Sequence, residues 1–160
     1  MANKVLVAVF SAGGVTRKVG KEIANICDGS YFEIIPEEKY TKGDLNWMNK
    51  RSRSSLEMKD PSARPAIALK LVNMDEFDTI ILGYPIWWGL APRIIETFLE
   101  SYDMEGKTII PFCTSGGSGM GNSDTELHKN VSGNVKWKNG VQINRPNEKA
   151  IRSWLEEVLD

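Results

Sequence analysis

The sequence predicts an α/β protein with a doubly wound, five-stranded parallel sheet in the order 2-1-3-4-5 and helices on both faces. Short runs rich in β-branched residues alternate with segments of helical periodicity along the whole chain, and this alternation is typical of parallel sheets. Right-handed crossovers leave few topologies for five such strands, and this order is a common one for open sheets. The chain has 160 residues, which suits one domain, so we expect residues 1–160 to form a single unit.

The first half of the chain predicts two strands and two helices. KVLVAVF at residues 4–10 is rich in β-branched residues and predicts a buried strand. Apolar residues then recur at helical spacing over 15–27, and Gly29 is expected to end that helix. SYFEIIP at 30–36 predicts the second strand. A helix is expected over 46–60, and the prolines of DPSARPAIA that follow it indicate an irregular connection.

The second half continues the alternation. DTIILG at 78–83 and KTIIPFCT at 107–114 predict the third and fourth strands. Pro92 suits the first turn of a helix whose apolar face runs to Tyr102. The last residues, 150–159, carry one amphipathic stripe and predict the final helix.

Two shorter segments are more ambiguous. Ser123 and Glu126 have the spacing of a capping box, which predicts a short helix. NVKWKNGVQI at 134–143 predicts the fifth strand, although its Asn-Gly pair is also compatible with a hairpin.

Composition excludes several classes of function. Lys and Arg number 20 against 21 Asp and Glu, a net charge of −1, so we expect neither nucleic acid nor a membrane as a partner. The apolar run of MANKVLVAVFSAGG is too short for a signal or membrane segment, and a cytoplasmic location is expected. Cys27 and Cys113 lie far apart without a CxxC pair, which predicts reduced buried thiols and no metal site.

Three loops of unusual composition follow the first, third and fourth strands. They read SAGGVT at 11–16, PIWWG at 85–89 and TSGGSGMG at 114–121. In the predicted order these three strands are neighbours, and open sheets of this kind bind ligands beyond the carboxyl ends of their strands. The three loops are therefore expected to meet at one binding site.

The first loop has the properties of a phosphate cradle. Gly13 and Gly14 allow the backbone to turn its N–H groups inward, and the helix N-terminus adds partial positive charge. The loop lacks GxxxxGK[ST] and GxGxxG, which disfavours triphosphate hydrolysis and dinucleotide binding. A tight strand-to-helix turn that needs glycine is the alternative explanation. The expected phosphate ligands are Ser11, Ala12, Gly13, Gly14, Val15 and Thr16.

The other two loops predict a site for a flat ring. An indole at the end of the third strand could stack on a planar aromatic ligand, although core packing is the alternative for each Trp. The glycines after the fourth strand allow a close approach to the polar edge of a ring, unless this is simply a flexible surface loop. The expected ligand residues are Pro85, Ile86, Trp87, Trp88, Gly89, Thr114, Ser115, Gly116 and Gly117. A phosphate site, a planar site and little acid–base machinery together indicate flavin mononucleotide (FMN).

The same three stretches resemble the flavodoxin family, in particular its short bacterial members with a PIWWG-type flavin loop. The resemblance implies that residues 11–16 hold the phosphate of FMN, that 85–89 lie along the isoalloxazine, and that 114–117 bond its pyrimidine edge. The chain departs from the family pattern at Gly13, where a hydroxyl residue is usual, and at Val15, where Asn is frequent. It is also nearly neutral, whereas electron-carrying flavodoxins are typically very acidic.

The sequence therefore predicts an FMN protein that carries electrons between redox partner proteins and has no catalytic acid or base of its own. An NAD(P)H-dependent FMN or quinone reductase of the same fold is the main alternative, and an interaction module that has lost its flavin is a weaker one. A receiver domain is disfavoured because Ser11 and Pro85 stand where acidic residues are needed. A cysteine phosphatase is disfavoured because Gly119 replaces the required Arg six positions after Cys113. His128, the only histidine, is expected on a helix surface.

Overall fold

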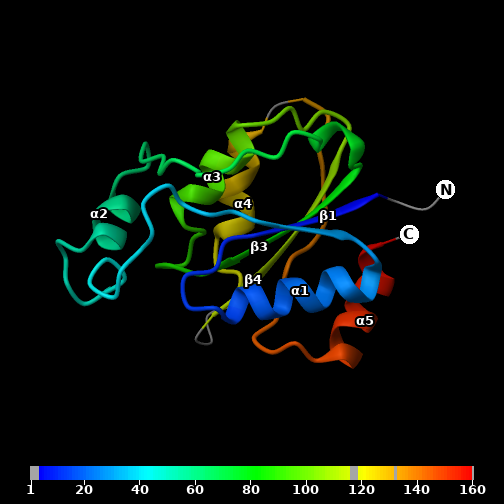
Figure 1. Cartoon of the computed structure of the whole chain (residues 1–160), viewed down its shortest axis with the longest axis horizontal. Helices are drawn as coiled ribbons and strands as arrows, with labels where there is room; N and C mark the ends of the chain where they lie inside the picture. The colour runs from blue at the N-terminus through cyan, green and yellow to red at the C-terminus, as the bar shows by residue number, and fades with distance from the viewer. Residues whose placement is uncertain (1–3, 116–118, 132, 160) are drawn as a thin grey trace.

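The computed structural model describes residues 4–115, 119–131 and 133–159 (Figure 1). Its strands are β1 (Val5–Val9), β2 (Ser30–Glu33), β3 (Thr79–Pro85), β4 (Thr108–Thr114), β5 (Lys136–Trp137) and β6 (Val141–Gln142). Its α-helices are α1 (Val15–Cys27), α2 (Arg53–Lys59), α3 (Arg93–Glu100), α4 (Ser123–Leu127) and α5 (Glu148–Val158), and two 3₁₀ turns are η1 (Met74–Glu76) and η2 (His128–Asn130).

The strands form one parallel sheet in the order β2-β1-β3-β4-β5, with β6 also beside β4. In the centre of this sheet Val7 of β1 lies opposite Tyr31 of β2 and Ile81 of β3. The predicted fold class and strand order are therefore confirmed.

Helices cover both faces of the sheet because alternate residues of a strand point to opposite sides. Val5, Val7 and Val9 of β1 pack with α1 and α5 in one apolar cluster. Leu6 and Ala8 of the same strand pack with α3 in the other cluster. The central strands are buried on both sides, which explains why they read as continuous apolar runs rather than alternating ones.

The fifth strand is present but interrupted. Residues 136–137 pair with 108–109, and residues 141–142 pair with 112–113, both in parallel. Ile109 and Cys113 accept hydrogen bonds from this side of the sheet, so Pro111, midway between them, faces the same neighbour. Pro has no N–H to donate, and the ladder breaks at this point. The strand interpretation is correct, and the Asn-Gly hairpin alternative is wrong.

The predicted helix over 46–60 begins seven residues later than expected, at Arg53. The side chains of Asn46 and Asn49 each accept a hydrogen bond from the N–H two residues on. Such local bonds compete with the helical pattern. Ser52 then caps the helix, because its hydroxyl accepts from the N–H of Ser55.

The short helix α4 forms without the predicted capping box. Asn122 is its N-cap residue and makes no side-chain cap bond. The hydroxyl of Ser123 instead donates to the carbonyl of Met120 and bonds the buried hydroxyl of Tyr84. His128 follows the helix, and its ring lies 4.3 Å from that of Trp137, centroid to centroid.

The two cysteines, both predicted to be buried, differ in exposure: Cys113 is buried, whereas Cys27 is only half-buried. Both are free, and burial raises the pKa of the Cys113 thiol to about 12. Within the described ranges, none of the helices has the length and apolar character to cross a bilayer.

Candidate functional site

The loops that follow β1, β3 and β4 meet at the carboxyl end of the sheet, as predicted. The hydroxyls of Thr16 and Thr114 are 2.8 Å apart and link the start of α1 to the end of β4. The N–H of Ile86 donates to the carbonyl of Thr114, which ties the β3 loop to the same point. The N–H of Asn122 donates to the carbonyl of Gly89 and joins the β3 and β4 loops. Gly116 and Gly117, two of the expected ligands, lie outside the described residues.

The β1 loop presents an open helix N-terminus. Gly14 is the N-cap residue of α1, has φ of 96°, and has no side chain that could cap the helix. The side chain of Ser11 accepts a hydrogen bond from the N–H of Gly14, which holds the turn and leaves the O–H of Ser11 able to donate. The first turn of α1 contains no acidic residue. The first N–H groups of a helix have no intrahelical partner and attract anions, so this turn is suited to a phosphate.

The remaining residues of this loop differ in exposure. Gly13 and Val15 are exposed, whereas Thr16 is buried. A Cβ added at Gly13 would meet nothing within 4 Å, so space is open on that side of the turn. Thr16 was expected to face a phosphate, but its hydroxyl is hydrogen-bonded to the hydroxyl of Thr114.

Arg17 is a charged group of this site that the sequence reasoning did not single out. A Cβ added at Gly14 would lie 3.7 Å from its Nη1 atom, so the guanidinium stands beside the loop. Its Nε and Nη2 donate to the carboxylate of Glu33 at 2.7 and 2.8 Å. These hydrogen bonds lower the pKa of Glu33. Sequence spacing could not reveal this pair, because Arg17 lies on α1 and Glu33 on β2.

The β3 loop is a tight two-residue turn. Trp87 and Leu90 exchange both backbone hydrogen bonds, at 2.9 and 3.1 Å. Trp88 and Gly89 between them have φ of 51° and 77°, which is the pattern of a type I′ turn. A Cβ added at Gly121 would lie 2.5 Å from the carbonyl oxygen of Gly89, so glycine is required where the two loops cross.

The two adjacent indoles have different environments. Trp87 packs edge-to-face against Phe10 and Tyr40, with ring centroids 5.8 and 5.5 Å away. Trp88 is 52% exposed, and its backbone adopts a left-handed conformation that bulky residues rarely adopt. The turn therefore anchors one indole in the protein and displays the other.

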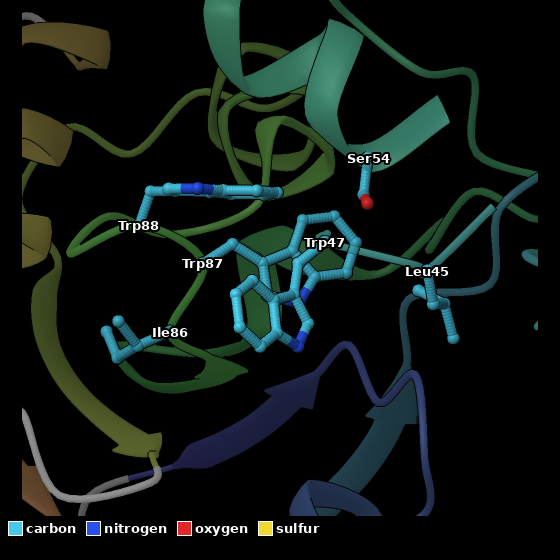
Figure 2. Close-up of a pocket in the computed structure, with 6 residues that line it drawn as sticks. All are labelled: Leu45, Trp47, Ser54, Ile86, Trp87 and Trp88. Carbon is cyan, nitrogen blue, oxygen red and sulfur yellow. The ribbon is translucent and has the colours of Figure 1, made fainter. Parts of the chain in front are cut away.

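A cavity of about 360 Å³ adjoins this turn, and Figure 2 shows how its side chains lie. Its lining comes from two segments: Ile86, Trp87 and Trp88 from the β3 loop, and Leu45, Trp47 and Ser54 from the excursion between β2 and β3. Trp47 was not predicted as a site residue, because it lies in irregular turns and its position depends on the fold.

A second cavity of about 230 Å³ lies along the β1 loop, where Ser11, Ala12 and Arg17 form part of its lining. Tyr40 also borders this cavity and contacts Trp87 of the first one. The cavity along the β1 loop and the cavity beside the two indoles therefore meet at the Tyr40–Trp87 contact.

The backbone polar groups of Ser115, directly after β4, already form hydrogen bonds within the protein. The N–H of Ser115 donates to the side-chain oxygen of Asn144 at 2.9 Å, and the Asn144 amide donates back to the Ser115 carbonyl at 2.8 Å. Ser115 was expected to bond the edge of a ring, and here Asn144 occupies its N–H. Among the described residues, no group of three His, Cys, Asp or Glu side chains could hold a metal ion.

Comparison with known proteins agrees with this geometry. The model of a family described as Flavodoxin matches residues 4–158, whereas no curated protein matches the chain. A candidate flavoprotein from Bacteroides eggerthii is 50% identical, with 98% of both chains covered and a TM-score of 0.93. Another from Bacteroides uniformis is 47% identical, with a TM-score of 0.92 over 98% of this chain and 99% of that one. A Lactobacillus acidophilus flavoprotein solved in complex with FMN shares the fold at 20% identity, with a TM-score of 0.71 over 96% of this chain and 99% of that one. The chain therefore belongs to the flavodoxin family.

Proposed function

We propose that this protein binds FMN at the three-loop site and carries electrons between redox partners. FMN is the cofactor that membership of the flavodoxin family implies, and the structurally similar Lactobacillus flavoprotein was solved with it. When bound, the flavin supplies the redox chemistry. The protein then has to hold the phosphate, orient the ring and limit its contact with water.

The uncapped N-terminus of α1 is the observation that supports a phosphate site. Gly14 offers no competing cap, Ser11 keeps a donor, and Arg17 adds a positive charge close to the turn. The donors are neutral N–H and O–H groups together with a guanidinium, which suits a dianion that is bound but not transferred. The residues present therefore fit the phosphate of FMN.

The exposed indole of Trp88 supports a binding site for the flavin ring. Trp88 is held by the two hydrogen bonds of its turn and by the Gly89–Asn122 bond. A planar ligand along residues 85–89 would stack on an indole whose backbone the turn already holds in place, and a pre-organised contact loses less entropy on binding.

A flavin titration tests the cofactor assignment. Apoprotein titrated with FMN should quench the flavin fluorescence at one FMN per chain. Riboflavin, which has the same ring and no phosphate, should bind at least about tenfold more weakly, because a hydrogen bond to a charged group is worth roughly 1.5–3 kcal/mol. Equal affinity for the two flavins would remove the phosphate assignment.

An NAD(P)H-dependent reductase is the second candidate, and the cavity beside Trp47 favours it, since a reductase needs room for a small substrate beside the flavin. Anaerobic addition of NADH or NADPH to the FMN-loaded protein separates the two functions. A carrier should keep its oxidised visible spectrum for minutes, whereas rapid bleaching by either nucleotide would favour the reductase.

A further inference from the structure

A third, larger cavity of about 630 Å³ lies beside the exposed indole of Trp88. Trp88 and Trp47 line it as they line the first one, and Met48 and Met58 add further apolar surface. Trp47 is 67% exposed and Met48 is 73% exposed. Large apolar side chains exposed singly are ordinary, but a cluster around one hollow indicates a binding surface.

The segment that carries Trp47 is held in place by hydrogen bonds. Residues 41–52 form a series of hydrogen-bonded turns, and the carbonyl of Asp44 accepts from the N–H of Ser54 at the start of α2. Arg53 lies 3.9 Å above the ring of Tyr40 and pairs with Glu57. The exposure of Trp47 is therefore maintained by a structured segment. Figure 1 shows this segment and α2 beyond the carboxyl ends of the strands.

The far end of α2 is also fixed. Arg93, which is buried, donates to the carbonyls of Glu57 and Met58 and pairs with Glu96 at 2.8 Å. The C-terminal turn of α2, which carries Met58 and Lys59, is thereby fastened to α3. The cavity has a fixed wall on this side as well.

The opposite wall is held in a strained conformation. Trp88 keeps φ of 51°, a left-handed backbone that bulky residues rarely adopt. Strain of this kind persists where the surroundings enforce it and concentrates at ligand sites. Here it presents an indole to the same hollow as Trp47.

The charges around the cavity have one sign. Lys50 and Lys59 line it, and no acidic residue is among its lining residues. Neither ammonium group forms an ion pair within the part of the chain that the structure describes. Ser55, the remaining polar lining residue, already donates its hydroxyl to the carbonyl of Asn49. The polar character of the cavity is therefore cationic.

We propose that this cavity is a binding site for a small planar aromatic anion, such as an aromatic carboxylate. Its ring would lie against Trp47 and Trp88, and its carboxylate would pair with Lys50 and Lys59. Two indoles favour a flat ring over an aliphatic chain, and two free ammonium groups favour a negative over a neutral ligand. The site is separate from the phosphate cradle at residues 11–16. It shares Trp88 with the proposed flavin site, because this residue lines both cavities; the flavin would lie on one face of the indole and the anion on the other, so binding here neither requires nor excludes FMN.

Calorimetric titration with 2-naphthoate and with its neutral isostere 2-naphthamide tests the charge requirement. In both the apoprotein and the FMN-loaded protein, 2-naphthoate should bind at one per chain and 2-naphthamide about tenfold more weakly. Lys50→Gln and Lys59→Gln should each weaken 2-naphthoate about two- to fivefold, the range for an exposed ion pair. Lys149→Gln, a matched loss of charge on α5, should leave the affinity unchanged.

Removal of one indole provides a separate test. Trp47→Ala should weaken both naphthalene ligands, because it removes the ring contact, while the circular dichroism spectrum stays native. A failure of 2-naphthoate to bind at millimolar concentration, or equal binding of the amide, would overturn the proposal. Mutual exclusion of FMN and 2-naphthoate would also overturn it, because the cavity would then belong to the flavin. If 2-naphthoate binds and FMN does not, only the cofactor proposal fails.

Discussion

At the scale of single residues, the two neighbouring tryptophans carry the clearest functional information. Trp87 packs against Phe10 and Tyr40, as an ordinary apolar residue would. Trp88 is largely exposed and has a strained backbone, so it contributes little to folding and costs some stability. A residue that costs stability and is displayed at a loop crossing is better explained by a ligand than by packing.

Substitution of each indole tests this difference. Trp88→Gly removes the strain of the left-handed backbone, which stabilises the folded state, but it also increases the conformational entropy of the unfolded chain, which destabilises the fold. Because these effects oppose each other, the free energy of unfolding should change by no more than about 1 kcal/mol. Trp87→Ala removes a half-buried indole and should cost about 2–3 kcal/mol, somewhat below the range for fully buried aromatics. Urea denaturation measures both values. A loss above about 2 kcal/mol for Trp88→Gly would mean that Trp88 is a packing residue.

The Arg17–Glu33 pair gives a pH-dependent prediction. Hydrogen bonds from Arg17 lower the pKa of Glu33 below its ordinary value of 4.5. A lowered pKa means that the pair contributes its full stability above pH 4.5 and loses it as the pH falls through the folded-state pKa. Glu33→Gln should therefore lower the urea midpoint most near neutral pH, and the difference from the wild type should shrink in acid.

The matched control for this pair is Glu148→Gln, which removes an ion pair with Arg152 on the exposed surface of α5. Its effect on the urea midpoint should be smaller at neutral pH, because exposed ion pairs contribute little. An effect of Glu33→Gln that does not vary with pH would show that the carboxylate charge is not the stabilising feature.

At the scale of elements, the periodicity of apolar residues predicts those helices and strands whose pattern is set by packing on the sheet. The central strands and α1 were found from their own residues, because burial on the sheet imposes their pattern. The start of α2 was missed because the side chains of Asn46 and Asn49 and the Ser52 cap outweigh the helical pattern. The break in the fifth strand was missed because its cause, Pro111, lies on the neighbouring strand.

The same reasoning explains which parts of the site could be predicted. The loops after β1, β3 and β4 were predicted because topology places them together. Trp47 and Arg17 were not, since their relevance arises from contacts with distant segments. Thr16 lies in the first turn of α1, but its bond to Thr114 depends on the separation of two strands and could not be inferred from either loop.

The attachment of α2 to α3 gives a prediction at this scale. Arg93→Met keeps the apolar stem but leaves two carbonyls and Glu96 without a buried cation. The free energy of unfolding should fall by about 2–4 kcal/mol, near the range for a broken buried ion pair. Amide hydrogen exchange should accelerate more in α2 than in α1. The control is Arg152→Met, which breaks an exposed pair and should leave α2 exchange unchanged.

At the scale of the whole molecule, the site exists because the chain winds in both directions from β1. Strand β1 stands between β2 and β3, so the loop that enters α1 lies next to the loop that leaves β3. The Thr16–Thr114 and Gly89–Asn122 bonds then connect segments that are far apart in sequence. A ligand that bridges these loops should stabilise the whole fold rather than one segment.

Thermal unfolding with FMN tests this expectation. A ligand that binds only the native state stabilises it by about 2.7 kcal/mol at 100 times its Kd. For a domain of 150–250 residues each kcal/mol raises the Tm by roughly 2–4 °C, so FMN at that concentration should raise the Tm by about 5–10 °C. Riboflavin at the same concentration should raise it less, because it leaves the N-terminus of α1 without an anion. Added inorganic phosphate should reduce the shift with FMN by competing at residues 11–16, and leave the shift with riboflavin unchanged or larger. Equal shifts for the two flavins, insensitive to phosphate, would mean that the ring alone binds and that the open turn at Gly14 has a purely structural role.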